Sequence, residues 1–353
     1  PGAGRALHKA LAFIRAAVDG GPIPSLIAFD PSFRPSFPPS KGRREIKLRT
    51  GVDIGYDLGD DRWVAFCGLL LLPSGEEGLV RDFAHMAARG QVGRRFRFFL
   101  DQNRFPADTD CTALAGYALY KRGLIPADGL VGIARELLLA TAPAEPPPPP
   151  ESLVRPGVPM VYWHDGAEPD ALPRSRSHDP VVSANVLCVL LEARRLGLRD
   201  ADGAIDATRR YVAGHLLSDA YRNGSRYYPA PEAFLFAASR LVKGFPEYRA
   251  ELAGPLAEAI AGRDAEHRAH SGGNPRTALN VALRMLAAHN LGLRDGQEPR
   301  LRTLLRQQGR DGSWPALPCF TLGRLPVYSG SPVLSTLFAA AAIHVSLSQG
   351  AGD

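Results

Sequence analysis

Residues 105–123 read FPADTDCTALAGYALYKRG, in which two carboxylates stand at the start of an apolar run that ends in a glycine. Asp108 and Asp110 suit the first turn of a helix, where a side-chain oxygen can accept hydrogen bonds from free backbone N–H groups. Gly123 is a usual helix stop. The turns between them are small and apolar, so other helices can enclose this one. Burying a carboxylate costs free energy, so a pair of carboxylates at the start of an apolar, enclosed helix indicates a functional site.

Five further segments are also apolar nearly all round, which is typical of buried helices. They are 63–72, 181–191, 233–242, 277–287 and 333–343, and with 112–119 they make six. More charged, one-sided helices are expected between them, at 78–89, 128–141, 204–217, 247–262 and 298–307. The alternation predicts an all-α fold, an (α/α)6 toroid of inner and outer helices, because each such pair needs its neighbours to bury its apolar face.

The toroid is expected to form a single domain over residues 51–353, with a stiff, extended proline-rich loop at 143–150. Ahead of it, residues 1–50 are expected to hold a short amphipathic helix at 5–18 and an irregular wrapping segment rich in proline, serine and arginine. Strand signals are nearly absent, since we find no long alternating run of β-branched residues, and this agrees with an all-α fold.

The formal net charge of the 353-residue chain is +6, but its basic residues are mostly scattered. A nucleic-acid surface instead clusters Lys and Arg with stacking aromatic residues, so we expect no nucleic-acid partner. The densest basic run, 94–99, is interpreted as an outer helix face with solvated arginines. A contact with a phosphate or diphosphate is the alternative interpretation of this run.

Four cysteines, at 67, 111, 188 and 319, are isolated from one another. This spacing is typical of reduced core residues in a cytoplasmic protein, and it matches neither a zinc site nor a disulfide framework. No stretch is long and apolar enough to span a membrane, and the first residues lack the layout of a signal peptide. The chain begins at Pro rather than Met, as a truncated sequence would. Weak association with a membrane surface and the oligomeric state stay open.

Similar turns lead into five of the expected inner helices. Each has Pro near the first helical position, or Asp, Asn or Ser just before it, which is a helix-start device. All inner helices of a toroid begin at the same rim, so these turns are expected to converge around one cavity mouth. The polar and aromatic residues that they carry are Asp108, Asp110, His178, Asp179, Tyr227, Tyr228, His270 and Tyr328.

Residues 108–113 resemble the signature of the class II terpene cyclases, the superfamily of squalene–hopene and oxidosqualene cyclases. The diterpene version of that signature is Asp-x-Asp-Asp-Thr-Ala and the oxidosqualene version is Asp-Cys-Thr-Ala, so Asp-Thr-Asp-Cys-Thr-Ala reads as a hybrid. Residues 308–314 are similar to the Gln-x-x-x-Gly-x-Trp repeat of the same superfamily. In that repeat the glutamine caps helix ends and the tryptophan packs against the next repeat. The resemblance also implies an α/α toroid.

The resemblance implies an enzyme, an intramolecular cyclase, that starts its reaction by protonating an alkene or epoxide. Asp110 matches the proton donor, and Asp108 would share its proton or the hydrogen bonds around it. His178 is our first choice for the residue that orients or reprotonates Asp110, and His270 is the second. Cys111 stands where the diterpene version has a third acid, and it would pack or donate weakly. On the residues alone, the two acids are also explained as an N-cap and a first-turn partner of the helix dipole.

The carbocations of such a reaction need stabilisation without a nucleophile, which aromatic faces provide. Asp179 is a further polar rim group, and Asn185 and Asn280 inside inner helices would face a neighbouring backbone or the cavity. The aromatic candidates for binding the substrate are Trp63, Tyr117, Trp163, Tyr227, Tyr228, Phe234 and Tyr328.

One toroid is too small to enclose a triterpene as larger relatives do, so the expected partner is a shorter prenyl chain or a prenylated small molecule. We expect no metal and no cofactor, with Mg²⁺ needed only for a diphosphate substrate. Alternatives are a toroid enzyme that protonates a nonterpenoid alkene and a nonenzymatic toroid that binds a lipid or a protein. A zinc prenyltransferase subunit is disfavoured by the ligand spacing, and a sugar-processing α/α barrel by the apolar inner helices.

Overall fold

The computed structural model describes residues 2–99, 104–144, 154–270 and 277–350. The chain divides into two compact units, which are described separately. The first unit consists of Pro1–Gly42, Leu71–Val80 and Ala220–Asp353, and the second of Arg43–Leu70 and Arg81–Asp219.

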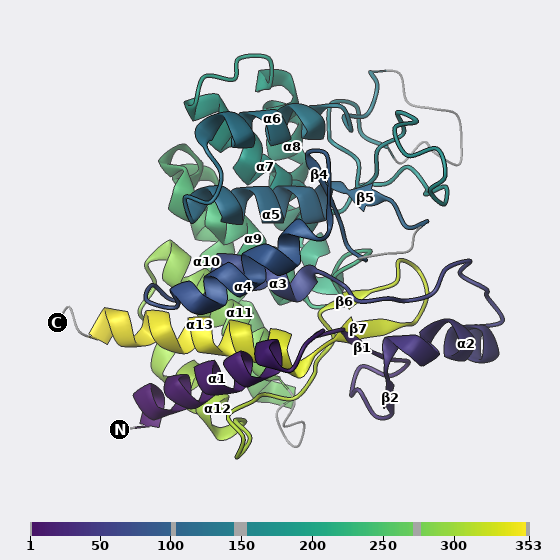
Figure 1. The fold of residues 1–353 in the computed structure, drawn as a ribbon. Coiled ribbons are helices and arrows are strands. Elements are labelled where there is room, and N and C mark those ends of the chain that lie inside the picture. The colour runs from purple at the N-terminus through teal and green to yellow at the C-terminus, as the bar shows by residue number, and fades with distance from the viewer. Residues whose placement is uncertain (1, 100–103, 145–153, 271–276, 351–353) are drawn as a thin grey trace. The chain divides into compact units, whose positions relative to one another are not determined.

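The second unit holds the stretch 105–123, which forms helix α5 (Thr109–Lys121). This helix packs against α6 (Ala127–Leu138) and α7 (Pro180–Arg195), and α7 packs against α8 (Asp202–Leu217). The same unit contains α3 (Trp63–Leu71), most of α2 (Pro39–Thr50) and α4 (Glu77–Ala88), and the strands β3 (Gln91–Val92), β4 (Arg95–Arg97) and β5 (Ala107–Asp108). Helices α5 and α7 are buried along nearly their whole length, whereas α6 and α8 bury one face (Figure 1).

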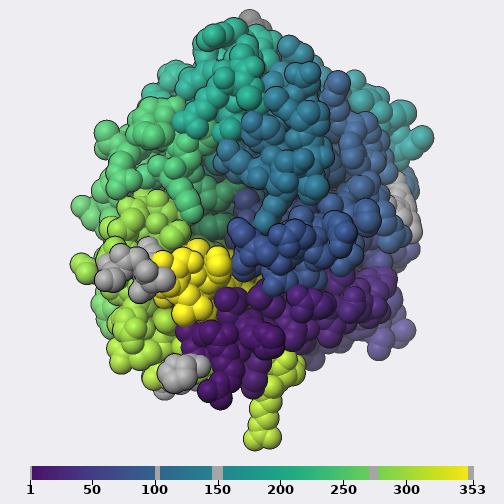
Figure 2. Space-filling view, turned by 60° about the vertical axis from the view of Figure 1, so that its left-hand side comes forward, coloured from purple at the N-terminus to yellow at the C-terminus, as the bar shows by residue number. Residues whose placement is uncertain are grey.

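The first unit repeats this alternation. Helix α9 (Pro231–Gly244) packs against α10 (Arg249–His270) and α11 (Ala278–Leu291), and α11 also packs against α12 (Gln297–Arg306) and α13 (Pro332–Gly350). Helix α1 (Gly2–Asp19) packs along α13, and Figure 2 shows these purple and yellow surfaces side by side. The unit also holds β1 (Leu26–Ala28), β2 (Ser36–Phe37), β6 (Phe320–Thr321), β7 (Tyr328–Gly330) and two short 3-10 turns, Ala220–Asn223 and Pro246–Tyr248.

The inner and outer helices that the sequence analysis expected are all present except at 94–99, with ends that differ by up to eight residues. The fold is mostly helical, as predicted. A closed (α/α)6 ring and a single domain over residues 51–353 stay predictions, since the two units are described separately.

The fold is not purely helical, because the described residues also contain two small antiparallel sheets, which the nearly absent strand signals did not predict. Their strand orders are β2-β1-β7-β6 and β3-β4-β5. The segment 22–50 is therefore not irregular, since it supplies β1, β2 and α2. The run 94–99 is likewise not an outer helix, because its middle forms β4, in which Arg95 and Phe96 are buried. Three phenylalanines in six residues favour a strand, and the strands are too short to show alternation.

The second motif joins three helices of the first unit. Gln308 Nε2 donates to the carbonyl oxygens of Ala6 in α1 and of Gly312, both at 2.9 Å. The fully buried Trp314 donates from Nε1 to Leu304 O at 2.9 Å, in the last turn of α12. Its backbone N–H donates to Thr336 Oγ1 of α13 at 3.0 Å. The tryptophan packs between helices as the resemblance implied, but it is the indole, not the glutamine, that caps the helix end.

All four cysteines are buried and free, as predicted. In the part of the chain that the structure describes, no helix has the length and apolar character needed to cross a bilayer.

Candidate acid site

Three buried helices of the second unit each begin next to a buried aspartate that caps backbone N–H groups. Asp61 Oδ1 accepts from Trp63 N at 3.2 Å at the start of α3. Asp108 Oδ1 accepts from Cys111 N at 2.7 Å at the start of α5. At the start of α7, Asp179 Oδ1 accepts from Val181 N at 2.9 Å and Val182 N at 3.4 Å. The side-chain oxygens thereby satisfy N–H groups that a helix start leaves free.

The starts of α5 and α7 lie at one edge of the unit. Val161 links them, because its carbonyl oxygen accepts from Thr109 N at 2.9 Å while its N–H donates to Ser177 O at 2.9 Å. At the other end of both helices, Lys121 Nζ lies 3.0 Å from Glu192 Oε1. The two helices therefore run parallel, as the rim prediction requires of inner helices.

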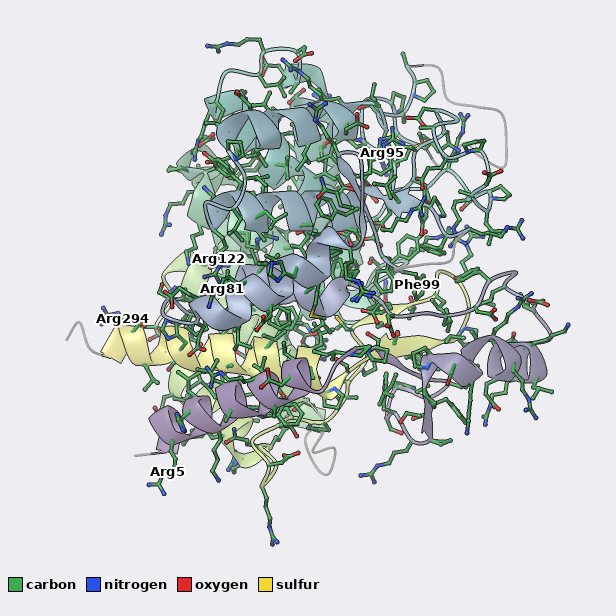
Figure 3. The ribbon with its side chains drawn as sticks, viewed as in Figure 1. Arg5, Arg81, Arg95, Phe99, Arg122 and Arg294 are labelled. Carbon is green, nitrogen blue, oxygen red and sulfur yellow. The ribbon has the colours of Figure 1, made fainter. Side chains whose placement is uncertain are left out.

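Helix α3 runs in the same direction as α5. Near the start of each helix, strand β4 and the residues after it join the two: Phe96 N donates to Thr112 Oγ1 at 2.8 Å, and Arg62 N donates to Phe98 O at 2.8 Å. Near the end of each, Arg122 Nε donates to Leu69 O at 2.7 Å. Arg122, labelled in Figure 3, directly follows the last residue of α5.

Asp110 lies in the first turn of α5 and is 7% exposed. Asn185 on α7 donates from Nδ2 to Asp110 Oδ1 at 2.8 Å, and Asn185 is itself only 5% exposed. An interhelical hydrogen bond in so dry a place fixes the orientation of the carboxyl group. It joins residues 75 positions apart in the sequence.

Asp108 is deeply buried, at 4% exposed. Burial raises its pKa from 3.8 to about 6, although hydrogen bonds from the Cys111 backbone and thiol and the charge of Arg174 pull the pKa down. Burial also raises the pKa of the Cys111 thiol, and the charges of Asp108 and Asp110 raise it further. Cys111 is therefore a neutral thiol that donates to Asp108, which fits the expected weak donor.

His178 does not take the place that we predicted beside Asp110. Its Nε2 accepts from Arg155 N at 2.8 Å and its Nδ1 donates to Pro159 O at 3.2 Å. This is the pattern of a neutral imidazole, and burial lowers its pKa. The side chain precedes the cap of α7 and turns back onto the segment before it, so Asn185, one turn into the helix, reaches the acid instead.

Two of the aromatic candidates lie on helices of this unit. Trp63 is buried in the first turn of α3, and its ring stacks on Phe98 with centroids 6.2 Å apart. Tyr117 is half-buried two turns beyond Asp110 on α5, with Lys121 Nζ 5.4 Å from its ring centroid.

Trp163 lies on the loop between α6 and α7. Its Nε1 donates to Glu136 O at 2.8 Å, and the Arg95 guanidinium stands 4.3 Å from its ring centroid. A cation of the protein itself therefore already covers one face of this ring.

The remaining candidates belong to the first unit, so their distance from Asp110 stays untested. Tyr227 and Tyr228 precede α9, Phe234 is buried on α9, and Tyr328 is half-buried on β7. His270 is the last residue of α10 and not part of a turn. The turn expected after it lies outside the described residues.

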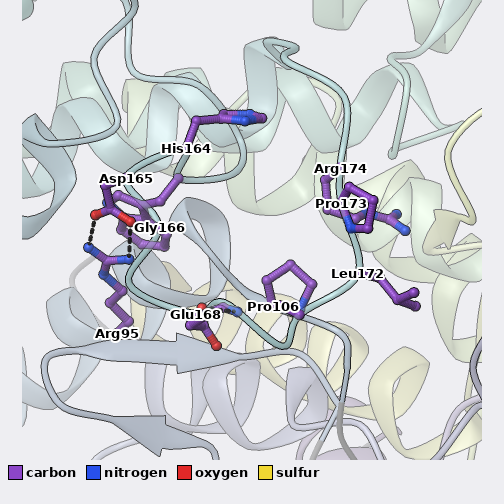
Figure 4. A pocket seen from close by; sticks show the side chains of 12 residues that line it. Arg95, Pro106, His164, Asp165, Gly166, Glu168, Leu172, Pro173 and Arg174 are labelled. Atoms are coloured by element: carbon purple, nitrogen blue, oxygen red, sulfur yellow. Dashed lines mark hydrogen bonds and ion pairs between the residues drawn. The ribbon is translucent and has the colours of Figure 1, made fainter.

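A cavity of about 140 Å³ opens beside the start of α5 (Figure 4). Charged pairs line it: Arg95 binds Asp165 and Glu136, and Glu168 accepts from Ala107 N at 3.0 Å. A volume well under the roughly 300 Å³ of small ligand pockets, with so polar a wall, does not suit a prenyl chain. This pocket is therefore not the apolar cavity that the sequence predicted.

Sequence reasoning missed one charged residue near the acids, Asp61. Asp61 could have been found, because it stands just before an expected inner helix as Asp108 does. Arg174, an arginine that the sequence offered as part of a basic rim for a diphosphate head group, places its guanidinium 4.7 Å from the Phe105 ring centroid and 5.1 Å from that of Tyr162. Among the residues that the structure describes, no three His, Cys, Asp or Glu side chains gather as metal ligands would.

Comparison with solved structures places this geometry among known folds. The type II terpene cyclase MstE from Scytonema superimposes with a TM-score of 0.62 over 98% of this chain and 99% of its own, at 12% identity. A crystal structure of a protein from Actinoplanes gives a TM-score of 0.64 over 98% and 99%, at 13% identity. This chain has the fold of a type II terpene cyclase. The ent-copalyl diphosphate synthase of Streptomyces platensis shares it less fully, with a TM-score of 0.51 over 86% of this chain and 53% of that one, at 14% identity.

Sequence comparison supports the same resemblance. The drimenol cyclase of Aspergillus calidoustus is 30% identical over 180 residues, which are 51% of this chain and 31% of that protein. The chain thus spans about a third of the length of the curated relative that it matches. No protein-family model matches the sequence. The resemblance to class II terpene cyclases, first seen in residues 108–113, is therefore confirmed.

Proposed function

We propose that this protein is a class II terpene cyclase, an isomerase that closes rings in a prenyl chain after Asp110 protonates it. The observation that carries the proposal is the buried pair of Asp110 on α5 and Asn185 on α7, 2.8 Å apart at the start of an inner helix. Asp108 supports it, because a neighbouring acid with a pKa of about 6 keeps a proton near Asp110 under mildly acidic conditions, below about pH 6.

The chemistry of the proposal needs only the chain's own groups to begin. Asn185 donates to Asp110 Oδ1, so Oδ2 carries the acidic proton and transfers it to an alkene carbon or an epoxide oxygen of the substrate. The resulting carbocation is attacked by the next double bond of the same chain, which forms a ring bond and moves the charge along. Loss of a proton, or capture of water, ends the sequence. Asp110 is left as a carboxylate, which Asn185 stabilises until it is reprotonated.

The substrate that we propose is a prenyl chain shorter than a triterpene, free as a diphosphate or joined to a small scaffold. Two relatives support this class. A variant of MstE is described in complex with geranylgeranyl dihydroxybenzoate as substrate, and another with merosterolic acid A as product. The sequence relative is a drimenol cyclase. Mg²⁺ would serve only a diphosphate head group, and we propose a cytoplasmic location.

Deuterium incorporation tests the proposal. The protein is incubated in D2O with farnesyl diphosphate, geranylgeranyl diphosphate or geranylgeranyl dihydroxybenzoate, with and without a chelator, and products are analysed by mass spectrometry. A protonation-initiated cyclase yields a cyclic product with one solvent deuterium bound to carbon. Asp110→Asn should abolish this product, whereas Asp82→Asn, an exposed acid on α4, should leave it unchanged.

Two outcomes contradict the proposal. If the Asp110→Asn variant still cyclises the substrate, Asp110 is not the proton donor. Solvent deuterium in an alkene that carries no prenyl chain would instead favour the nonterpenoid alternative.

A further inference from the structure

The acid motif of this chain lacks one charge. Where the diterpene version of the signature has a third aspartate, this chain has Cys111, and burial keeps that thiol neutral by raising its pKa. Cys111 is 1% exposed, so solvent does not replace the missing carboxylate. A third negative charge at the site can therefore come only from a carboxylate in another part of the chain.

Asp61 is such a carboxylate. It is 3% exposed and caps the start of α3, which runs parallel to α5 and begins at the same edge. It also pairs with Phe99 in a β-bridge that continues the strand contacting Thr112 of α5. Its negative charge is close enough to act on Cys111, whose pKa it raises.

We propose that Asp61 supplies, from the start of α3, the third carboxylate of the acid site, in place of the aspartate that Cys111 replaces. This proposal rests on the proposed function, since it assigns Asp61 as a positioning residue for the proton that Asp110 donates. Asp61 touches no reacting atom and acts through its charge.

The charges around the acids decide the direction of this effect. Asp61 adds a third negative charge to those of Asp108 and Asp110, and a like charge disfavours ionisation of a neighbouring acid. Arg174 opposes it at Asp108, Arg62 is the neighbour of Asp61 in the chain, and Asn185 is neutral. Removing the charge of Asp61 should therefore lower the pKa of the acid pair, which then loses its shared proton at lower pH.

An infrared titration tests this without any substrate. The absorption of protonated carboxyl groups is recorded against pH, and the band of the acid pair is identified by its loss in Asp108→Asn and Asp110→Asn. In Asp61→Asn the band should disappear at a pH lower by roughly one unit. Asn and Ser also cap helices, so Asp61→Asn and Asp61→Ser keep the start of α3 while removing the charge. Asp128→Asn, in the exposed first turn of α6, is the matched control and should not move the band.

A rescue experiment tests the same idea through activity. With a substrate that the wild type cyclises, Asp61→Asn should move the alkaline limb of the kcat profile to lower pH, because the active form is the protonated one. Cys111→Asp in the Asp61→Asn background restores a third carboxylate and should move the limb back.

The outcomes separate the two proposals. An unchanged infrared midpoint in both Asp61 variants overturns the role of Asp61, whatever the substrate. Failure of the wild type to cyclise any substrate counts against the proposed function, while the infrared titration still decides on Asp61.

Discussion

At the scale of single residues, Asp108 is both a helix cap and a buried acid. Its pKa is about 6 when folded and 3.8 in the reference state. The folded state therefore holds the proton more tightly, so this residue's contribution to stability is complete below pH 3.8 and is lost as the pH rises through about 6. The loss amounts to about 3 kcal/mol at 1.36 kcal/mol per pKa unit.

Asp108→Asn should remove this dependence while keeping the helix cap. Relative to wild type, the variant's free energy of unfolding should rise between pH 4 and pH 7, measured by chemical denaturation at each pH. Parallel stability curves for the two proteins would show that Asp108 ionises in the fold without penalty.

In the proposed reaction, the hydrogen bond from Asn185 to Asp110 Oδ1 leaves Oδ2 to carry the proton. Asn185→Ala removes a donor to a buried carboxyl, which is worth roughly 1.5–3 kcal/mol or about a 10- to 100-fold loss in kcat. Asn290→Ala is the matched control, because Asn290 also makes an interhelical bond, to Ser239 Oγ at 3.0 Å. Steady-state kinetics should show the loss in kcat for Asn185→Ala only. An equal loss of kcat in both variants would mean that Asn185 contributes only to helix packing.

A residue of the candidate site could be predicted where the sequence directly around it carries the signal. Asp108 and Asp110 could be found because both lie within one six-residue signature, residues 108–113. Asn185 stood out only as a polar residue in an apolar helix, and its contact depends on the relative rotation of two helices. His178 was preferred as the partner of Asp110 because it lies in a turn before an inner helix. Its ring instead bonds to the backbone of Arg155 and Pro159, and no sequence pattern predicts these contacts.

At the scale of elements, periodicity located the long helices well, because each shows its burial over three turns or more. Helix α2 was missed, since Pro39 and Gly42 interrupt a charged segment of only 12 residues. The strands have two or three residues each, too few for alternation to appear, and their pairing depends on partners far along the chain, such as β1 with β7.

A substitution at Gly312 tests how firmly helix α1 packs against the segment that follows α12. The φ of Gly312 is +90°, and a Cβ there would stand 2.5 Å from Lys9 O of α1. Gly75 has a similar φ of +95° with nothing near its Cβ, so it isolates the backbone strain. Gly75→Ala should cost about 1–2 kcal/mol, and Gly312→Ala clearly more, because α1 must also shift. Thermal unfolding of both variants measures the difference in stability. Equal losses of stability would mean that α1 moves away from the added methyl group at no cost.

At the scale of the whole molecule, the sequence predicts one shared cavity. The acids lie in the second unit, whereas Tyr227, Tyr228, Phe234 and Tyr328 lie in the first. If the toroid closes as predicted, these rings stabilise carbocations formed by Asp110. Sequence patterns located both sets of residues but not the distance between them, which depends on packing between helices far apart in sequence.

Tyr328→Leu tests the shared cavity. A lost cation–π contact of about 2 kcal/mol in a dry site should raise the share of partly cyclised products several-fold, measured by mass spectrometry. Tyr120→Leu, near the far end of α5, should leave the product pattern unchanged. An unaltered pattern in Tyr328→Leu would place that ring outside the cavity.

The bond from Gln308 to Ala6 has a consequence for the order in which the protein is made. Helix α1 leaves the ribosome well before the partners that hold it, because α12, α13 and the motif between them follow about 300 residues later. At 5–20 residues per second that delay is on the order of tens of seconds. The segments of the acid site are complete by residue 219, so they can assemble during translation while α1 waits for its partners.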